Sequence, residues 1–195
     1  MLEASLPVEG NPLRDWQAVV IGGGIINGLS QRGLWPAQPL GAILADDPSL
    51  LKRWKRALDL AAAMSEDPKV PTGTRYDALR MLGMEPWEKR GAQLVRSLSR
   101  DANAELQMGA VSALGDLSSP QATAALVAAL DDLSGNNREL AMDALLRDDL
   151  RAEALLDRAT ARGWKAEALG TNRIAKLRDH PNPSVRARAR RLFQP

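Results

Sequence analysis

Alanine and large apolar residues recur along the middle of the chain with the spacing of one helix face. In three segments an Ala stands four residues before a Leu: 75–83, 107–115 and 138–145. Residues at positions i and i+4 lie on the same side of a helix, so each segment predicts a helix with one apolar face. The three anchors, Ala78, Ala110 and Ala141, recur at a nearly constant interval, close to the length of one helix–turn–helix unit. The small Ala side chains allow neighbouring helices to approach closely.

Second helices are predicted between these segments. Residues 87–98 and 122–133 carry apolar side chains at helical spacing, and short links rich in Gly, Pro, Ser and Asn separate all of these helices. A fourth Ala-to-apolar step, from Ala189 to Phe193, extends the pattern to the end of the chain. The interval from Ala141 to Ala189 is about half as long again as the others, so we expect a stretched, less regular repeat over residues 151–176.

The composition supports a helical fold. The chain has 31 Ala and 30 Leu but only 13 Val and Ile together, and β-branched residues are the usual material of strands. Helix–turn–helix units repeated at this spacing predict an all-α, right-handed superhelical solenoid of nine or ten helices. The runs 101–115 and 182–189 resemble short, Ala-rich HEAT repeats. We expect an atypical N-terminal helical cap over residues 1–47 and HEAT-like repeats over 48–195.

A glycine-rich stretch, Gly22–Gly28, follows the apolar run Ala18–Ile21. One interpretation is the phosphate-binding turn of a dinucleotide-dependent oxidoreductase, with Asp46 near the position of a ribose-binding acid. However, Asn27 stands where that motif needs a small residue, and the chain lacks further strands for a parallel sheet. The alternative is a helix from about Asp15, as its N-cap, to Ser30, whose glycines allow a neighbouring backbone to pack closely.

Two longer segments carry a family resemblance. Residues 16–30, followed by Arg32-Gly-Leu-Trp-Pro36, and residues 179–193 are similar to the helical region of large exported proteins of planctomycetes and verrucomicrobia. In that family, a dehydrogenase-type β-propeller precedes HEAT repeats and a c-type haem domain follows them. The resemblance implies that this chain is a middle segment of an exported, haem-containing redox protein, and so of periplasmic or exported location. Without that resemblance, a cytoplasmic location is expected.

Several kinds of chemistry are excluded by residue type. The chain has no Cys and a single His, His180, so a thiolate metal site, a cysteine nucleophile and a multi-histidine metal site are excluded. No apolar run approaches the roughly 18 residues of a membrane span. We therefore expect no enzyme activity, no cofactor and no membrane span. The acidic pairs at 46–47, 131–132 and 148–149 fall at predicted helix ends, where carboxylates cap backbone amides.

Charge is uneven along the chain. The net charge is +2, but residues 164–195 carry eight basic and two acidic side chains. The candidate interaction surface in this region, called the basic cluster below, is Arg173, Lys176, Arg178, Arg186, Arg188, Arg190 and Arg191. It predicts either a surface that binds nucleic acid phosphates or an acidic partner, or a solvated outer face of the last helices. The run Lys52–Arg56 has the same two interpretations, with Trp54 either stacking on bases or buried.

The function these observations favour is a non-enzymatic scaffold that binds protein, either neighbouring domains of a longer chain or another polypeptide. A solenoid that binds nucleic acid through the basic cluster is the alternative, and a dinucleotide-binding oxidoreductase is the remote one. Retention on a heparin column that disappears with moderate salt distinguishes the second from the first. A rise in melting temperature on adding a dinucleotide distinguishes the third.

Overall fold

The computed structural model describes residues 2–6 and 14–193, and the regular structure in this part of the chain is entirely helical. No strand occurs among these residues, so the all-α prediction is confirmed. There are more helices than expected, because short helices such as α1 and α11 were not predicted. In chain order the helices are α1 (Leu2–Ser5), α2 (Asp15–Gln31), α3 (Ala37–Ala45), α4 (Pro48–Glu66), α5 (Thr72–Leu82), α6 (Trp87–Arg96), α7 (Ala104–Asp116), α8 (Pro120–Ala129), α9 (Gly135–Ala144), α10 (Asp149–Arg162), α11 (Ala166–Leu169), α12 (Thr171–Arg178) and α13 (Pro183–Leu192).

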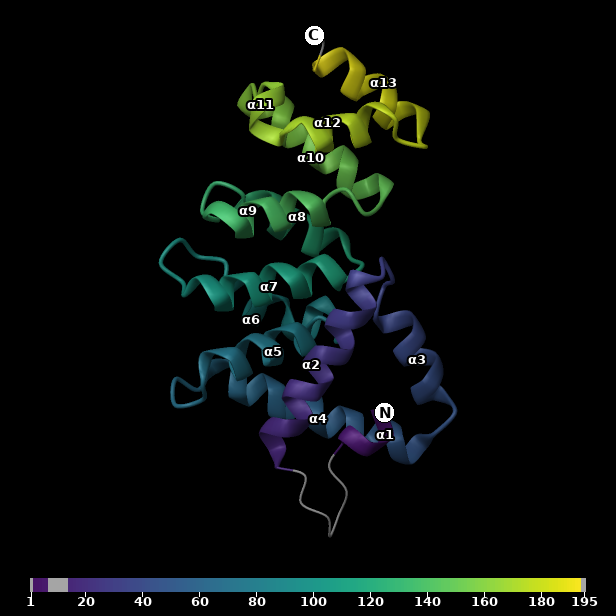
Figure 1. Ribbon diagram of the computed structural model, residues 1–195, viewed down its shortest axis with the longest axis vertical. Helices are drawn as coiled ribbons and strands as arrows, with labels where there is room; N and C mark the ends of the chain where they lie inside the picture. The colour runs from purple at the N-terminus through teal and green to yellow at the C-terminus, as the bar shows by residue number, and fades with distance from the viewer. Residues whose placement is uncertain (1, 7–13, 194–195) are drawn as a thin grey trace.

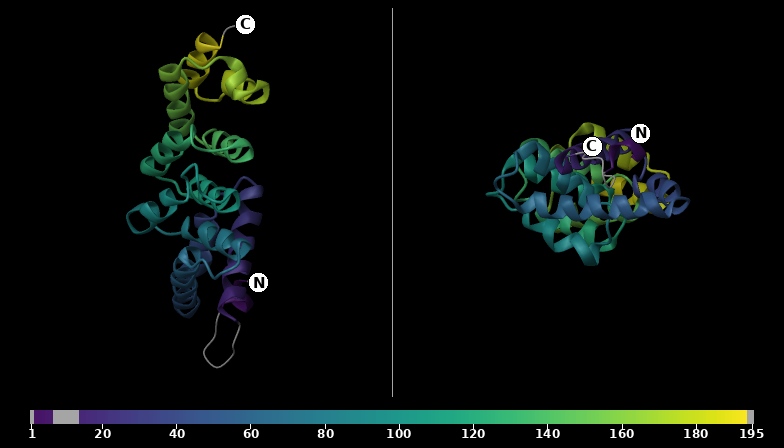
Figure 2. Two further views of the ribbon diagram at one scale, coloured as in Figure 1. Left: turned by 90° about the vertical axis from the view of Figure 1, so that its left-hand side faces the viewer. Right: turned by 90° about the horizontal axis from the view of Figure 1, so that it is seen from below.

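The helices between α4 and α13 form two rows. In the first row, α5 packs on α7 and α7 packs on α9 (Figure 1). In the second row, α6 packs on α8, α8 on α10 and α10 on α13 (Figure 2). The molecule is elongated, with α1 and α13 at opposite ends. Its accessible surface of 10224 Å² exceeds the roughly 9,000 Å² expected for a compact protein of this mass.

Small residues set the distance between helices of the first row. The anchors Ala78, Ala110 and Ala141 are all completely buried, as the sequence predicted. A methyl group added to Gly83 would lie 2.6 Å from the carbonyl oxygen of Ala113, and one added to Gly115 would lie 3.2 Å from Cβ of Ala144. These contacts leave no room for larger side chains, so the helices pack almost backbone to backbone.

Polar contacts connect each helix to its counterpart about one repeat away. In the first row, Nδ2 of Asn137 donates to Oε1 of Gln107 at 2.9 Å, across 30 residues of sequence. Between α6 of the second row and α4, which precedes the rows, Nη2 of Arg90 lies 3.3 Å from Oδ1 of Asp59, across 31 residues. Arg96 and Glu66 form an ion pair across 30 residues. Equivalent positions of successive helices therefore lie side by side.

The structure corrects the predicted position of the last repeat. The sequence pattern aligned Ala189 of α13 with the first-row anchors, but α13 packs on α10 and belongs to the second row. The first-row position after α9 is taken by α12, whose Arg173 binds Asp143 across 30 residues. The repeat is stretched less than expected, since α12 begins 36 residues after α9, compared with 31 residues from α7 to α9 and 32 from α5 to α7. The irregularity of this region comes from α11, which is inserted between Gly163 and Gly170, two glycines with φ of +60° and +80°.

The N-terminal region does not continue the two rows. Helix α2 is steeply inclined to α5 and α7 and packs on both α4 and α5 (Figure 1). It is a continuous helix through Gly22–Gly28, as the helical interpretation expected. Only two of these glycines make close contacts: a Cβ on Gly22 would meet Met81, and one on Gly23 would lie 2.9 Å from Cα of Asp77. Asp15 is the first residue of the helix rather than its N-cap, a position held by Arg14.

Candidate functional site

A buried ionic network joins α2, α5 and α7 near the C-terminal ends of these helices. Asp116, the last residue of α7, is 3% exposed and accepts hydrogen bonds through both carboxylate oxygens. Its Oδ2 lies 2.6 Å from Oγ of Ser30 in α2 and 3.1 Å from Nη2 of Arg80 in α5, and its Oδ1 lies 2.7 Å from Nη1 of Arg147. One carboxylate therefore holds two guanidinium groups that approach from either side of α7.

A further arginine, Arg151, is buried beside this network. Arg151 is 1% exposed and donates to the carbonyl oxygens of Leu114, Gly115, Leu117 and Ala144, which end α7 and α9. Its pKa is lowered mainly by this burial, with Asp148 acting in the opposite direction. A cation near unpaired carbonyls at a helix C-terminus is electrostatically favourable, so Arg151 stabilises two helix ends at once.

Trp35, in the loop after α2, covers the outer side of these arginines. The centroid of its ring lies 4.2 Å from Cζ of Arg147 and 5.0 Å from Cζ of Arg151. In addition, Nη2 of Arg147 donates to the carbonyl oxygen of Leu34 at 2.8 Å, across 113 residues of sequence. These cation–π and hydrogen-bond contacts attach the N-terminal region to the residues that follow α9.

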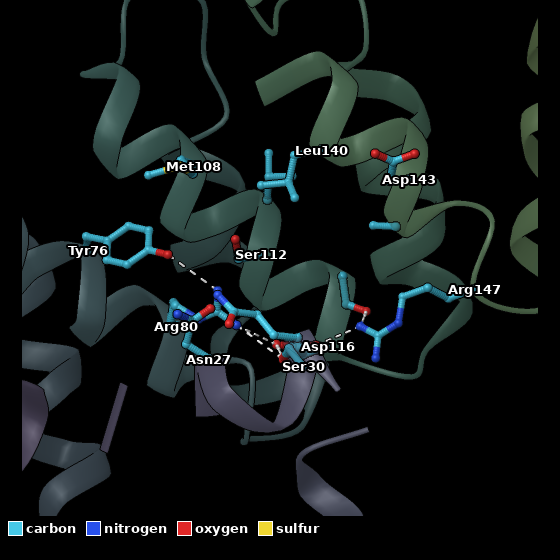
Figure 3. A pocket seen from close by; sticks show the side chains of 14 residues that line it. Asn27, Ser30, Tyr76, Arg80, Met108, Ser112, Asp116, Leu140, Asp143 and Arg147 are labelled. Atoms are coloured by element: carbon cyan, nitrogen blue, oxygen red, sulfur yellow. Dashed lines mark hydrogen bonds and ion pairs between the residues drawn. The ribbon is translucent and has the colours of Figure 1, made fainter. Parts of the chain in front are cut away.

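An open groove of about 360 Å³ begins at this network and extends along α7 (Figure 3). Tyr76 and Arg80 of α5 form one side, and Leu140 and Asp143 of α9 form the other. The last turn of α2 closes the end near Asp116. The complete lining is Asn27, Ser30, Gln31, Tyr76, Arg80, Met108, Val111, Ser112, Gly115, Asp116, Leu140, Asp143, Ala144 and Arg147. The groove therefore crosses three helices of the first row and is a candidate binding site.

The basic cluster is distributed over two helices and is largely engaged in contacts within the chain. Arg173 binds both Asp143 and Glu139, and the hydrogen bond to Asp143 is the main cause of its raised pKa. Arg188 pairs with Asp157 at 2.6 Å and Arg190 with Asp179 at 3.6 Å. Arg186 donates to the carbonyl oxygens of His180 and Pro181. Lys176, Arg178 and Arg191 make no ion pair with another described residue.

The other charged candidates have structural contacts. Trp54 is 4% exposed, so the run Lys52–Arg56 is one turn of an amphipathic helix rather than an exposed stacking platform. Asp47 caps α4 by accepting from the backbone N–H of Ser49, and Asp148 caps α10 by accepting from that of Arg151, as predicted for paired carboxylates at helix ends. Asp131 instead pairs with Arg158 and Arg162 of α10.

Sequence reasoning missed the network and the groove. Arg80 stands between two buried residues in the segment Leu79–Met81, and Asp116 ends an apolar helix face. A charged residue on an otherwise apolar helix face, with a residue of opposite charge about one repeat later, was the sequence signal that could have predicted this ionic network. Asp116 and Arg147 are 31 residues apart, close to the repeat length.

Comparisons with known proteins identify no family for this chain: no protein-family model, no curated protein and no solved structure matches it. Within the described residues, no group of three or more His, Cys, Asp or Glu side chains is arranged to hold a metal ion. Among the same residues, no helix combines the length and the apolar character needed to cross a bilayer.

Proposed function

We propose that this chain is a non-enzymatic scaffold that binds protein, built as a right-handed superhelical solenoid of HEAT-like helix pairs. The observation that carries the proposal is the series of polar contacts between equivalent positions one repeat apart, such as Asn137 with Gln107 and Arg96 with Glu66. In such a stack each helix pair contacts its neighbours only. The outcome is an extended surface, which repeat proteins use for binding.

The groove supports binding rather than catalysis. Its one buried carboxylate, Asp116, has both oxygens occupied by Ser30, Arg80 and Arg147. A carboxylate held in this way is a structural counter-ion and is poorly suited to accept a proton from a substrate. The apolar lining formed by Met108, Val111 and Leu140 suits contact with side chains of another polypeptide.

The resemblance to exported proteins of planctomycetes and verrucomicrobia adds a second element to the proposal. In that context the partners would be the neighbouring redox domains of the same polypeptide. The complete reading frame of the gene tests this element: a β-propeller encoded upstream and a Cys-x-x-Cys-His motif downstream would support it, and unrelated or absent flanking domains would contradict it.

The scaffold proposal is tested by purifying the tagged full chain from its native cells at moderate salt. We expect a stoichiometric complex with one or a few defined polypeptides, measured by native mass spectrometry. The same purification from cells treated with nuclease is the control, because a complex held together by nucleic acid would dissociate. Recovery of the chain alone, or with nucleic acid only, would contradict the proposal.

A further inference from the structure

The groove along α7 is only partly covered by the chain itself. Helix α2 packs on α5, and its last turn reaches Asp116, but the half-buried side chains of Met108, Ser112 and Leu140 lie beyond it (Figure 3). We propose that this groove binds an extended segment of a partner protein that presents one large apolar side chain and one acidic side chain. This inference rests on the proposed scaffold function and specifies its binding site.

The dimensions of the groove set the size of the segment. Its floor extends along α7 from Met108 to Asp116, which corresponds to roughly 12 Å at 1.5 Å per residue of helix. At about 3.3 Å per residue, an extended chain covers that length with roughly four residues. The volume of about 360 Å³ is sufficient for a large apolar side chain between Met108 and Leu140, with space for a second, smaller one.

Polar groups without partners favour an extended segment over a helix. Asn27 and Ser112 line the groove, and neither side chain forms a hydrogen bond with another described residue. The oxygen of Tyr76 accepts from Nη1 of Arg80 at 3.4 Å, which leaves its own hydrogen free to be donated. An extended backbone has N–H and C=O groups that need partners on binding, whereas those of a helix are already paired.

The charge at the closed end of the groove selects the acidic side chain. Arg80 and Arg147 share the single carboxylate of Asp116, so this network carries one excess positive charge. Nε of Arg80 is also buried without a hydrogen-bond partner. On the opposite side, the carboxylate of Asp143 is bound by Arg173 at 2.7 and 2.9 Å. The same guanidinium also binds Glu139, so it offsets part of the repulsion that Asp143 exerts on an incoming acid.

At this end of the groove, α2 already places one polar group, the hydroxyl of Ser30, against Asp116 and Arg80. Oγ of Ser30 lies between Oδ2 of Asp116, at 2.6 Å, and Nη2 of Arg80, at 3.2 Å. The groove is continuous with this interface, because Asn27, Ser30 and Gln31 line its end. A partner segment would therefore extend an interface that the chain already forms with its own N-terminal helix.

The test uses a phage-displayed library of random short peptides, panned against the full-length chain. Selected peptides are synthesised with a fluorescent label, and their affinity is measured by anisotropy. We expect a shared motif of an apolar and an acidic residue, and a loss of affinity of at least about tenfold with Ser112→Arg, which fills the groove. The matched control, Ser118→Arg, makes the same change at an exposed residue outside the groove and should alter affinity less than about twofold.

Replacing the acidic residue of the peptide by its amide tests the charge without changing the protein, and should also weaken binding. Met108→Gln is the second protein variant, in case Ser112→Arg does not fold. Peptides that bind equally well to both groove variants, that carry no acidic residue or that bind as helices would overturn the inference, as would a failure to select any peptide. The native purification remains a separate test, because a stoichiometric partner insensitive to Ser112→Arg would support a scaffold that binds through another surface.

Discussion

The carboxylate of Asp116 and the guanidinium of Arg80 form an ion pair at 3.1 Å, with their side chains 2% and 5% exposed. They belong to different helices, 36 residues apart in sequence. Arg147 contacts the other oxygen of the same carboxylate at 2.7 Å. The carboxylate therefore bridges two cations at the junction of α5, α7 and the residues that follow α9.

We predict that Asp116→Asn lowers the free energy of unfolding by about 3–5 kcal/mol, because it leaves the buried guanidinium of Arg80 without its paired carboxylate. Urea denaturation followed by circular dichroism measures the change. The control is Asp132→Asn, which removes a carboxylate paired with Arg100 where both side chains are at least half exposed. It should cost less than about 1 kcal/mol, and equal losses in the two variants would contradict the structural role of Asp116.

The glycines of α2 give a prediction in which neighbouring substitutions have opposite signs. A Cβ at Gly23 would lie 2.6 Å from Cβ and 2.9 Å from Cα of Asp77, so Gly23→Ala should destabilise the protein by forcing α2 away from α5. Nothing lies within 4 Å of a Cβ at Gly24, so Gly24→Ala should stabilise the helix by roughly 0.5–1 kcal/mol. Thermal unfolding of the two variants measures both effects, and a shift of the same sign would show that α2 is packed differently.

The sequence was sufficient to predict the helices but not all of their positions. Ala78, Ala110 and Ala141 were identified correctly because local periodicity reports which face of a helix is buried. Ala189 shows the same local pattern but lies in the second row. Periodicity cannot distinguish the two rows, because both present an apolar face to the same core.

The candidate groove could not be predicted for a different reason. Its side chains come from four separate parts of the chain. The residues next to Asn27 and Tyr76 in the sequence give no sign that either side chain lines a groove. Trp35 was visible as part of a family resemblance, but its contact with Arg147 depends on the direction in which α2 crosses the first row. The basic cluster, in contrast, was visible as charge, while its ion pairs with Asp143, Asp157 and Asp179 required the fold.

Close packing at Ala110 gives a further prediction. This residue is completely buried between helices of the first row, so Ala110→Trp should destabilise the protein by several kcal/mol or prevent folding. Ala124→Trp makes the same change at an exposed position of α8 and should leave the midpoint of urea denaturation nearly unchanged. If the two variants unfolded at the same urea concentration, the proposed contact face would be misplaced.

Asp77 should make stability depend on pH in a defined direction. Burial against α2 raises its pKa from 3.8 to about 6, with Arg80 lowering it and Glu105 raising it further. The native state therefore holds a proton that the unfolded chain has already released. The stability that this group contributes is complete below pH 3.8 and is lost as the pH rises through about 6.

The variant Asp77→Asn tests this dependence, because Asn resembles the protonated side chain at every pH. Relative to the unsubstituted protein, its stability should increase between about pH 4 and pH 6 and then remain level. Denaturation midpoints measured across this range give the difference. A difference that does not change with pH would show that Asp77 is solvated in the folded protein.

Small-angle X-ray scattering distinguishes an extended stack of helix pairs from a compact globular chain. A compact globular chain of 195 residues has a radius of gyration of about 16 Å. The stacked arrangement predicts a clearly larger value for the monomer and a distance distribution with a long tail at high separations. A radius of gyration equal to that of the compact chain, with a symmetric distribution, would contradict the stack.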